Sequence, residues 1–200
     1  MSPNYVHPDP TALRALAHPV RLRMLGLLRS EGPSTSTLLA QRLGLNSGAT
    51  SYHLRNLAQH GFVVEDAERG DARDRWWRAA HQSTSADPDS PDPAHRDAVD
   101  AFSQAVAVIH GEQLQRAIEE RPLLPERWRR TTTVSDWALR LSPEDGAELL
   151  QRIFALFDEY LEREPTAGDS TEDTADLMFL LSAFPRPGTV VGDVEAGWHR

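Results

Sequence analysis

Length, composition and charge exclude several classes of protein. The 200 residues include no cysteine, which excludes disulfide bonds, thiolate zinc sites and cysteine nucleophiles. No apolar run approaches the roughly 20 residues that a membrane-spanning helix needs, and the start of the chain lacks the basic and apolar stretches of a secretory signal. We therefore expect a cytoplasmic protein that does not bind membranes.

The net charge of −9 is divided unevenly along the chain. Residues 1–82 hold ten Arg against seven acidic residues, whereas residues 83–200 hold eleven Arg against twenty-three acidic residues. A mildly basic region that suits phosphate is thus joined to an acidic region that phosphate would repel. At the change of sign, residues 83–93 read STSADPDSPDP, a proline-rich and almost wholly polar stretch that is typical of a linker. The domain boundary is expected there.

The chain before this linker predicts helices followed by a hairpin. The predicted helices cover residues 10–17, 19–31, 34–44 and 46–61. Each ends at a proline or glycine that disfavours helix. The candidate N-caps are Ser34 or Ser36 for the third helix and Asn46 or Ser47 for the fourth. Residues 62–64 and 76–77 then predict two strands joined by a polar loop, which completes the element order of a winged helix.

The chain after the linker predicts a mixed region. The expected elements are a long helix at 94–120, a strand at 137–141, a helix at 143–161 capped by Ser142, and a buried strand at 177–181. We expect residues 94–184 to form an α+β dimerisation or effector region, and residues 185–200 to form a loose tail. The predicted fold class is mainly α with a small β-hairpin wing, because a winged helix-turn-helix over residues 1–82 precedes this region.

Residues 34–64 have the features of a helix-turn-helix. Ala40 is small enough for the second helix to pack closely across the first, and Gly44-Leu45-Asn46 suits a tight turn. The second helix, at about 47–60, begins with short polar side chains, as entry into a major groove requires. The loop at about 65–76 would meet the adjacent backbone or minor groove. The predicted DNA-binding residues are Ser47, Thr50, Ser51, Tyr52, His53, Arg55 and Asn56 in the helix, and Arg69, Arg73 and Arg75 in the wing.

For several of these residues the sequence leaves a second role open. His53 is as well suited to orienting the helix as to touching a base, and Tyr52 could pack partly beneath it. Arg55 and the wing arginines could be solvated surface residues, as charged side chains usually are.

Two runs in this region resemble the ArsR-like family of winged-helix regulators. They are LRALAHPVRLRMLGLL, Leu13–Leu28, and TSYHLRNLAQHGFVV, Thr50–Val64. The family's motifs correspond here to Ala17-His18-Pro19-Val20-Arg21-Leu22 and to Ser51-Tyr52-His53-Leu54 with Gly61-Phe62-Val63. The resemblance covers residues 11–81. It implies a symmetric dimer that binds a double-stranded DNA operator, usually as a repressor.

Partners other than DNA are predicted from the second half of the chain. The long helix is the best candidate for the homodimer contact, through Phe102, Val106 and Ile109. A small-molecule effector is a further candidate partner, because aromatic residues recur between Trp128 and Phe179, although dimerisation is favoured over sensing. The eight histidines form no cluster with metal-ligand spacing, so we expect neither a metal site nor a cofactor.

The predicted function is a sequence-specific DNA-binding transcriptional regulator. The alternative is a winged-helix protein–protein interaction module that does not bind DNA. An enzyme is not expected, because the sequence has no phosphate-binding glycine loop, nucleophile elbow or HExxH motif.

Overall fold

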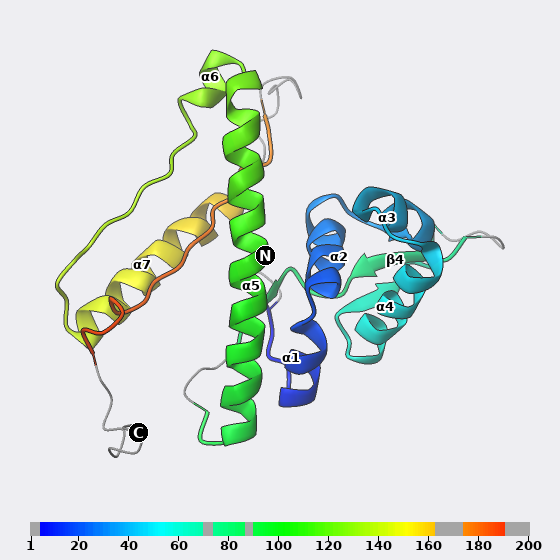
Figure 1. Cartoon of the computed structure of the whole chain (residues 1–200), viewed down its shortest axis with the longest axis horizontal. Helices are drawn as coiled ribbons and strands as arrows, with labels where there is room; N and C mark the ends of the chain where they lie inside the picture. Colours follow the sequence, from blue (N-terminus) through cyan, green and yellow to red (C-terminus); the bar gives the residue numbers. More distant parts are fainter. Residues whose placement is uncertain (1–4, 70–73, 87–89, 163–173, 191–200) are drawn as a thin grey trace, which may run out of the picture. The chain divides into compact units, whose positions relative to one another are not determined.

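A computed structural model describes residues 5–69, 74–86, 90–162 and 174–190 (Figure 1). The helices are α1 (Pro10–Leu16), α2 (Pro19–Ser30), α3 (Ser36–Leu43), α4 (Ser47–Gln59), α5 (Pro93–Glu120), η1 (Arg121–Leu123), α6 (Glu126–Arg129) and α7 (Pro143–Leu161). The strands are β1 (Tyr5–Val6), β2 (Ser34–Thr35), β3 (Val63–Glu65), β4 (Trp76–Ala79) and β5 (Ser83–Thr84). None of the described helices combines the length and apolar character needed to cross a membrane.

The first four helices begin at side chains that cap them. Asn46 caps α4, as one of the two predictions had it, and its Oδ1 accepts a hydrogen bond from the Ala49 amide at 2.8 Å. The cap of α3 is Thr35, whose Oγ1 accepts from the Leu38 amide at 3.2 Å. The prediction of Ser34 or Ser36 for this cap was wrong, because both neighbours of Thr35 are equally good capping residues and only the backbone geometry selects one.

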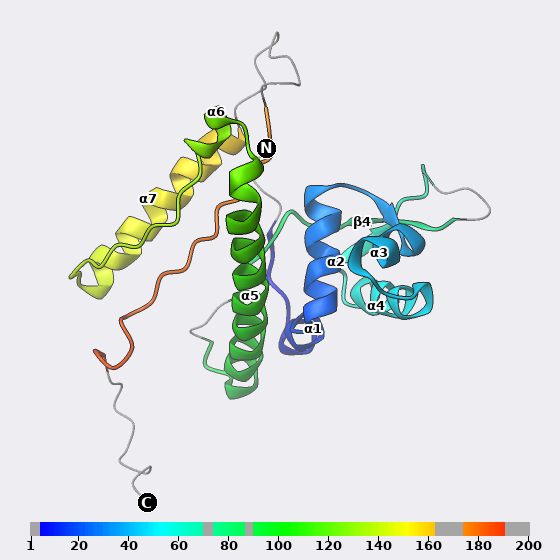
Figure 2. The same cartoon turned by 45° about the horizontal axis from the view of Figure 1, so that its top comes forward.

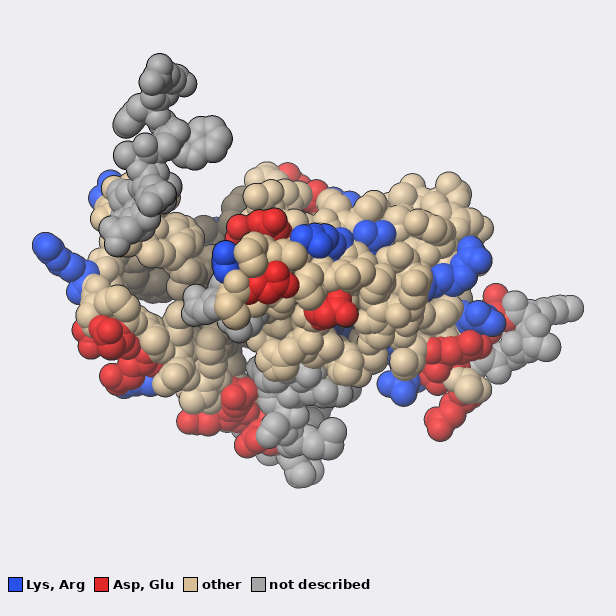
Figure 3. All heavy atoms as spheres, turned by 90° about the horizontal axis from the view of Figure 1, so that it is seen from below, with Lys and Arg blue, Asp and Glu red and all other residues tan. Residues whose placement is uncertain are grey.

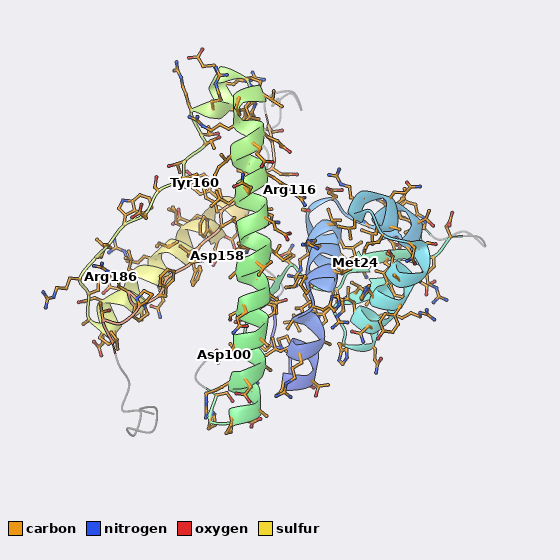
Figure 4. All side chains as sticks on the ribbon, in the orientation of Figure 1. Met24, Asp100, Arg116, Asp158, Tyr160 and Arg186 are labelled. Atoms are coloured by element: carbon orange, nitrogen blue, oxygen red, sulfur yellow. The ribbon has the colours of Figure 1, made fainter. Side chains whose placement is uncertain are left out.

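The core of the N-terminal region joins the helices to the hairpin. Its most deeply buried members are Leu16, Met24, Leu25, Leu28, Leu39, Leu54, Leu57, Phe62 and Val63, with Trp77 from the hairpin. Met24 points from α2 into this core (Figure 4). Since α4 contributes both Leu54 and Leu57, one face of this helix is fixed against the rest of the domain.

The predicted hairpin is confirmed and forms part of a three-stranded sheet in the order β2-β4-β3. Both pairings are antiparallel, with Val63 opposite Ala79 and Ser34 opposite Trp77. Strand β2 lies directly before α3 and pairs with β4, so the sheet connects the base of the wing to the start of the helix-turn-helix. A separate parallel pair joins β1 to β5, with Val6 opposite Thr84.

Helix α5 packs on the N-terminal helices along its first half. Leu13 of α1 is buried in one cluster with Ala98 and Val99 of α5. Figures 1 and 2 agree in showing α5 beside α1 and α2. Further along, Arg23 Nε of α2 donates a hydrogen bond to Glu112 Oε2 at 3.0 Å. The start of the predicted 94–184 region therefore shares its packing with the winged helix, and both lie in the same compact unit.

This packing differs from two predictions. Residues 83–84 of the predicted linker form strand β5, because Ser83 and Thr84 pair with a segment of the N-terminus that no local pattern identifies. Ile109 is buried and Phe102 packs on the intramolecular clusters. Val106 is half-buried. Two of the three residues predicted for the dimer contact, Phe102 and Ile109, thus face their own chain.

The C-terminal region contains α7 but neither of the two predicted strands. Within the part that the structure describes, residues 137–141 and 177–181 have no regular secondary structure. Trp137 is 80% exposed and Phe179 is 69% exposed, so neither segment is a buried strand. Apolar alternation at 137–141 and an apolar run at 177–181 predict strands, but neither segment pairs with another strand among the described residues. The prediction of a loose tail at 185–200 remains open, since residues 191–200 lie outside the described residues.

Candidate nucleic-acid interface

The turn between α3 and α4 has the geometry that a helix-turn-helix needs. Gly44 has a φ of +65°, in the left-handed region that favours glycine. The Leu45 amide donates to the Ala40 carbonyl oxygen at 2.8 Å, which closes the end of α3. Ala40 itself is buried. The turn and the small residue were both predicted from the sequence, and together they bring α4 across α3.

Helix α4 has one buried face and one exposed polar face. Thr50, Leu54 and Leu57 are buried. The exposed polar face consists of Ser47, Gly48, Tyr52, Arg55 and Gln59, with Ser51 half-exposed at its edge. These positions recur at intervals of three and four, so their side chains leave the helix in one direction. A helix with this arrangement can lie against a large polar partner without losing its own packing.

Thr50 does not belong to the exposed polar face. Its side chain is fully buried, and its Oγ1 donates to the Asn46 carbonyl oxygen at 3.0 Å. The prediction that Thr50 contacts DNA was therefore wrong. Threonine is polar and common in recognition helices, but at this position its methyl group fills the core while its hydroxyl is satisfied within the first turn.

Arg55 is the longest donor on the exposed polar face. Its Nε donates to the Ser51 carbonyl oxygen at 3.2 Å, while the residue as a whole stays exposed. Tyr52 is 59% exposed and extends from the preceding turn. Because Arg can donate in two directions from a planar group, this pair offers both directed hydrogen bonds and positive charge to a ligand.

His53 and Asn56 lie at the border of the two faces and are half-buried. The Nδ1 atom of His53 and the Oδ1 atom of Asn56 are buried without a hydrogen-bond partner among the described residues. Both side chains therefore turn at least partly away from solvent, and the structure favours the role of orienting the helix for His53.

The wing presents a different electrostatic surface. Arg75 lies 3.3 Å from the Glu65 carboxylate and 5.8 Å above the ring of Trp77. Arg69 is 3.8 Å from Asp66. The prediction for Arg73 falls outside the described residues. Residues 65–75 hold five acidic residues against three Arg, and Figure 3 shows acidic side chains around the wing, beside the grey loop at the right.

Gln59 belongs to the exposed polar face but is not among the predicted DNA-binding residues. It follows Arg55 by four residues, so helical spacing alone places it on the same side of α4. Gly48 is a second, and its lack of a side chain leaves the backbone at the start of the helix open. Both could have been found by extending the spacing from Tyr52 and Arg55 in each direction.

Several aromatic residues of the C-terminal region are exposed among the residues that the structure describes. Trp137, Phe154, Tyr160 and Phe179 are each more than half exposed. Among the residues that the structure describes, no group of three or more His, Asp or Glu side chains is close enough together to hold a metal ion.

A family model described as a helix-turn-helix domain matches residues 16–66. These residues run from the end of α1 into the loop after β3. The match agrees with the helix-turn-helix that the turn at Gly44 and the two faces of α4 define. Among curated proteins, none matches the sequence.

Several solved structures are similar to this chain. One is named "Possible transcriptional regulator for arsenical resistance"; it is 26% identical, with 55% of this chain and 94% of that chain covered and a TM-score of 0.31. Another is the homodimeric winged helix-turn-helix DNA-binding domain of Mb0332 from Mycobacterium bovis, named as a possible ArsR-family regulator; it is 26% identical over 53% of this chain and 82% of that chain, with a TM-score of 0.33. A third is ZitR from Lactococcus lactis, 17% identical over 72% and 83%, with a TM-score of 0.32.

Proposed function

We propose that this chain is a sequence-specific DNA-binding transcriptional regulator of the ArsR-like kind, because residues 16–66 match a helix-turn-helix domain and the β3–β4 hairpin stands where a winged helix has its wing. The observation that carries the proposal is the exposed polar face of α4. Its short residues come first and its longer donors follow, which suits a helix whose N-terminal part enters the major groove.

The charge distribution supports this orientation. Residues 1–64, which hold α1 to α4, carry six Arg against two acidic residues. Phosphate contacts supply most of the affinity of DNA-binding proteins and leave base contacts to give specificity. In this proposal the helical part of the domain supplies the phosphate contacts, and Tyr52 and Arg55 reach base edges.

The regulator acts as a homodimer and as a repressor in this proposal. Helix α5 carries the exposed apolar residues Val108, Leu114 and Ile118. A second copy of α5 would cover them. A dimer would present two copies of α4 to a symmetric operator, and bound at a promoter it would exclude polymerase.

The test is binding of the full chain to the promoter DNA of its own gene, measured by gel shift over a range of salt. We expect the logarithm of the affinity to fall linearly with the logarithm of the salt concentration. Arg55→Ala should weaken binding by about tenfold or more, since one directed base contact contributes about 1–3 kcal/mol. The matched control is Arg152→Ala on α7, which removes an exposed Arg from another helix.

Equal affinities for the two variants would contradict the placement of α4 on DNA. Association with a macromolecule that does not respond to salt would instead identify a winged-helix protein–protein module. For repression, deletion of the gene should raise transcription from the bound promoter.

A further inference from the structure

His18 and His53 bring two imidazole rings together at the junction of α2 and α4. His18 is the N-cap of α2, and its Nδ1 accepts a hydrogen bond from the Val20 amide at 3.2 Å. The ring of His53 in α4 lies with its centroid 4.8 Å from that of His18, at an angle of 48°. These two side chains, which we call the histidine pair, connect the start of α2 to the middle of α4, the proposed recognition helix.

The hydrogen bond to Val20 determines the protonation state of His18. A ring nitrogen can accept a hydrogen bond only when it carries no proton, so Nδ1 is the unprotonated nitrogen and the ring is neutral. Protonation of Nδ1 would remove the cap and set two N–H donors against each other. The cap and a positive charge on His18 are therefore mutually exclusive.

The surroundings of the histidine pair are positively charged. Burial lowers the pKa of His53 first, and the charges of His18 and Arg21 lower it further. Burial and Arg21 also lower the pKa of His18, against a smaller opposing effect of a hydrogen bond with the backbone of His18 itself. The guanidinium of Arg21 is itself half-buried and donates through Nε to the Ala15 carbonyl oxygen of α1.

Charged groups on the neighbouring elements make other contacts. Arg14 of α1 donates to the Ala94 carbonyl oxygen at 3.0 Å. Arg23 of α2 and Glu112 of α5 bind each other. From α4 itself, Tyr52 lies edge-on to His53 with 5.4 Å between ring centroids. The charges acting on the pair are thus those of the two rings and Arg21.

We propose that His18 is a positioning residue for the recognition helix: as a neutral ring it holds α4 against α2 through His53, and protonation of the pair displaces α4 and weakens DNA binding. The inference rests on the proposed function and deepens it, because His53 then positions α4 through its contact with His18 and does not itself contact DNA. Tyr52, its neighbour in sequence, belongs to the face offered to DNA.

The sign of the pH effect follows from the lowered pKa values. Above about pH 6.5, the ordinary pKa of histidine, both rings are neutral in the folded and unfolded chains and the contact is complete. As pH falls below that value the unfolded chain takes up protons more readily, so stability is lost until the folded rings titrate as well. In free protein α4 can shift to separate the charges, but α4 seated in a groove cannot, so acid also weakens binding.

The experiment compares promoter binding by the full chain at pH 7.5 and pH 5.5, in constant salt. We expect wild-type affinity to fall several-fold between the two. His18→Asn keeps an N-cap acceptor but removes the ring and cannot be protonated, so it should bind DNA less tightly than wild type at pH 7.5 and lose most of the pH dependence. His53→Gln should also flatten the profile, and the control His60→Gln, at the end of α4, should keep the wild-type profile.

Direct contact between His53 and phosphate predicts the opposite, since an added positive charge would tighten binding in acid. Tighter binding at pH 5.5, or a wild-type profile in His18→Asn, would overturn the proposal. Thermal unfolding of the DNA-free chain gives a second readout: wild type should lose more stability between pH 7.5 and pH 5.5 than His18→Asn. If no DNA binds at pH 7.5, the proposed function fails. Equal losses of stability in wild type and His18→Asn between pH 7.5 and pH 5.5 would separately refute the proposed role of the histidine pair.

Discussion

Thr50 and Tyr52 lie two positions apart on α4 and have opposite environments. Thr50 is fully buried and bonded to the Asn46 carbonyl, whereas Tyr52 is 59% exposed. The sequence presents both as polar residues near the start of a recognition helix. Only the direction in which each side chain leaves the helix separates a core residue from a contact residue.

The same contrast can be measured with two leucines. Leu54→Ala should lower the free energy of unfolding by about 2 to 5 kcal/mol, because it removes fully buried methyl groups and leaves a cavity beneath α4. Leu123→Ala is the matched control, since Leu123 is 83% exposed and should change stability by less than about 0.5 kcal/mol. Chemical denaturation of both variants measures the difference. Similar losses would show that α4 is not packed as described.

At the scale of elements, the wing and α4 differ in charge. The segment 65–75 has an excess of two acidic residues, and two of its arginines are already near carboxylates within the wing. The wing is therefore a weak anchor for phosphate, and the affinity of the domain should come mainly from its helices.

Removal of one negative charge from the wing should improve DNA binding. Glu68 is exposed in the described part of the wing, and Glu68→Gln should tighten binding by about two- to threefold at low salt, as expected from relief of weak repulsion at an exposed site. The gain should disappear at high salt. Glu162→Gln, at the end of α7, provides the same substitution outside the winged helix. Weaker binding by Glu68→Gln would indicate that this carboxylate orients a wing residue on DNA.

Helix α5 shows how one element can have two distinct apolar surfaces. One stripe, with Ala98, Ala105 and Ile109, is buried against the same chain. Val108 and Ile118 lie outside this stripe, and both are about half exposed. Apolar residues occur within the stripe and outside it, so periodicity in the sequence does not distinguish the intramolecular face from the candidate dimer contact.

At the scale of the whole molecule, this distinction predicts which substitution produces a monomer. Val108→Glu should shift the chain from dimer to monomer at micromolar concentration, because it places a charge in the proposed contact between two copies of α5. Val134→Glu is the control: Val134 is 65% exposed in the segment between α6 and α7. Sedimentation velocity distinguishes the two. A wild-type monomer, or a dimer that persists in Val108→Glu, would rule out this contact.

The charge asymmetry also acts at this scale. The excess of acidic residues after residue 82 leaves the mildly basic N-terminal region as the part of the chain that attracts DNA. This asymmetry is visible in the sequence without any structure, and it explains how a chain with a net charge of −9 can bind a polyanion.

The sequence by itself determined the helices of the N-terminal region, the turn at Gly44 and the hairpin. Their signals are local: prolines and glycines that end helices, caps such as Asn46, and a polar loop between short apolar runs. Only the tertiary structure decided that Thr50 and Phe102 face inward, that Ser83 pairs with the N-terminus, and that the apolar run at 177–181 is not a strand. Burial and strand pairing depend on which distant segment covers a residue, and no local pattern contains that information.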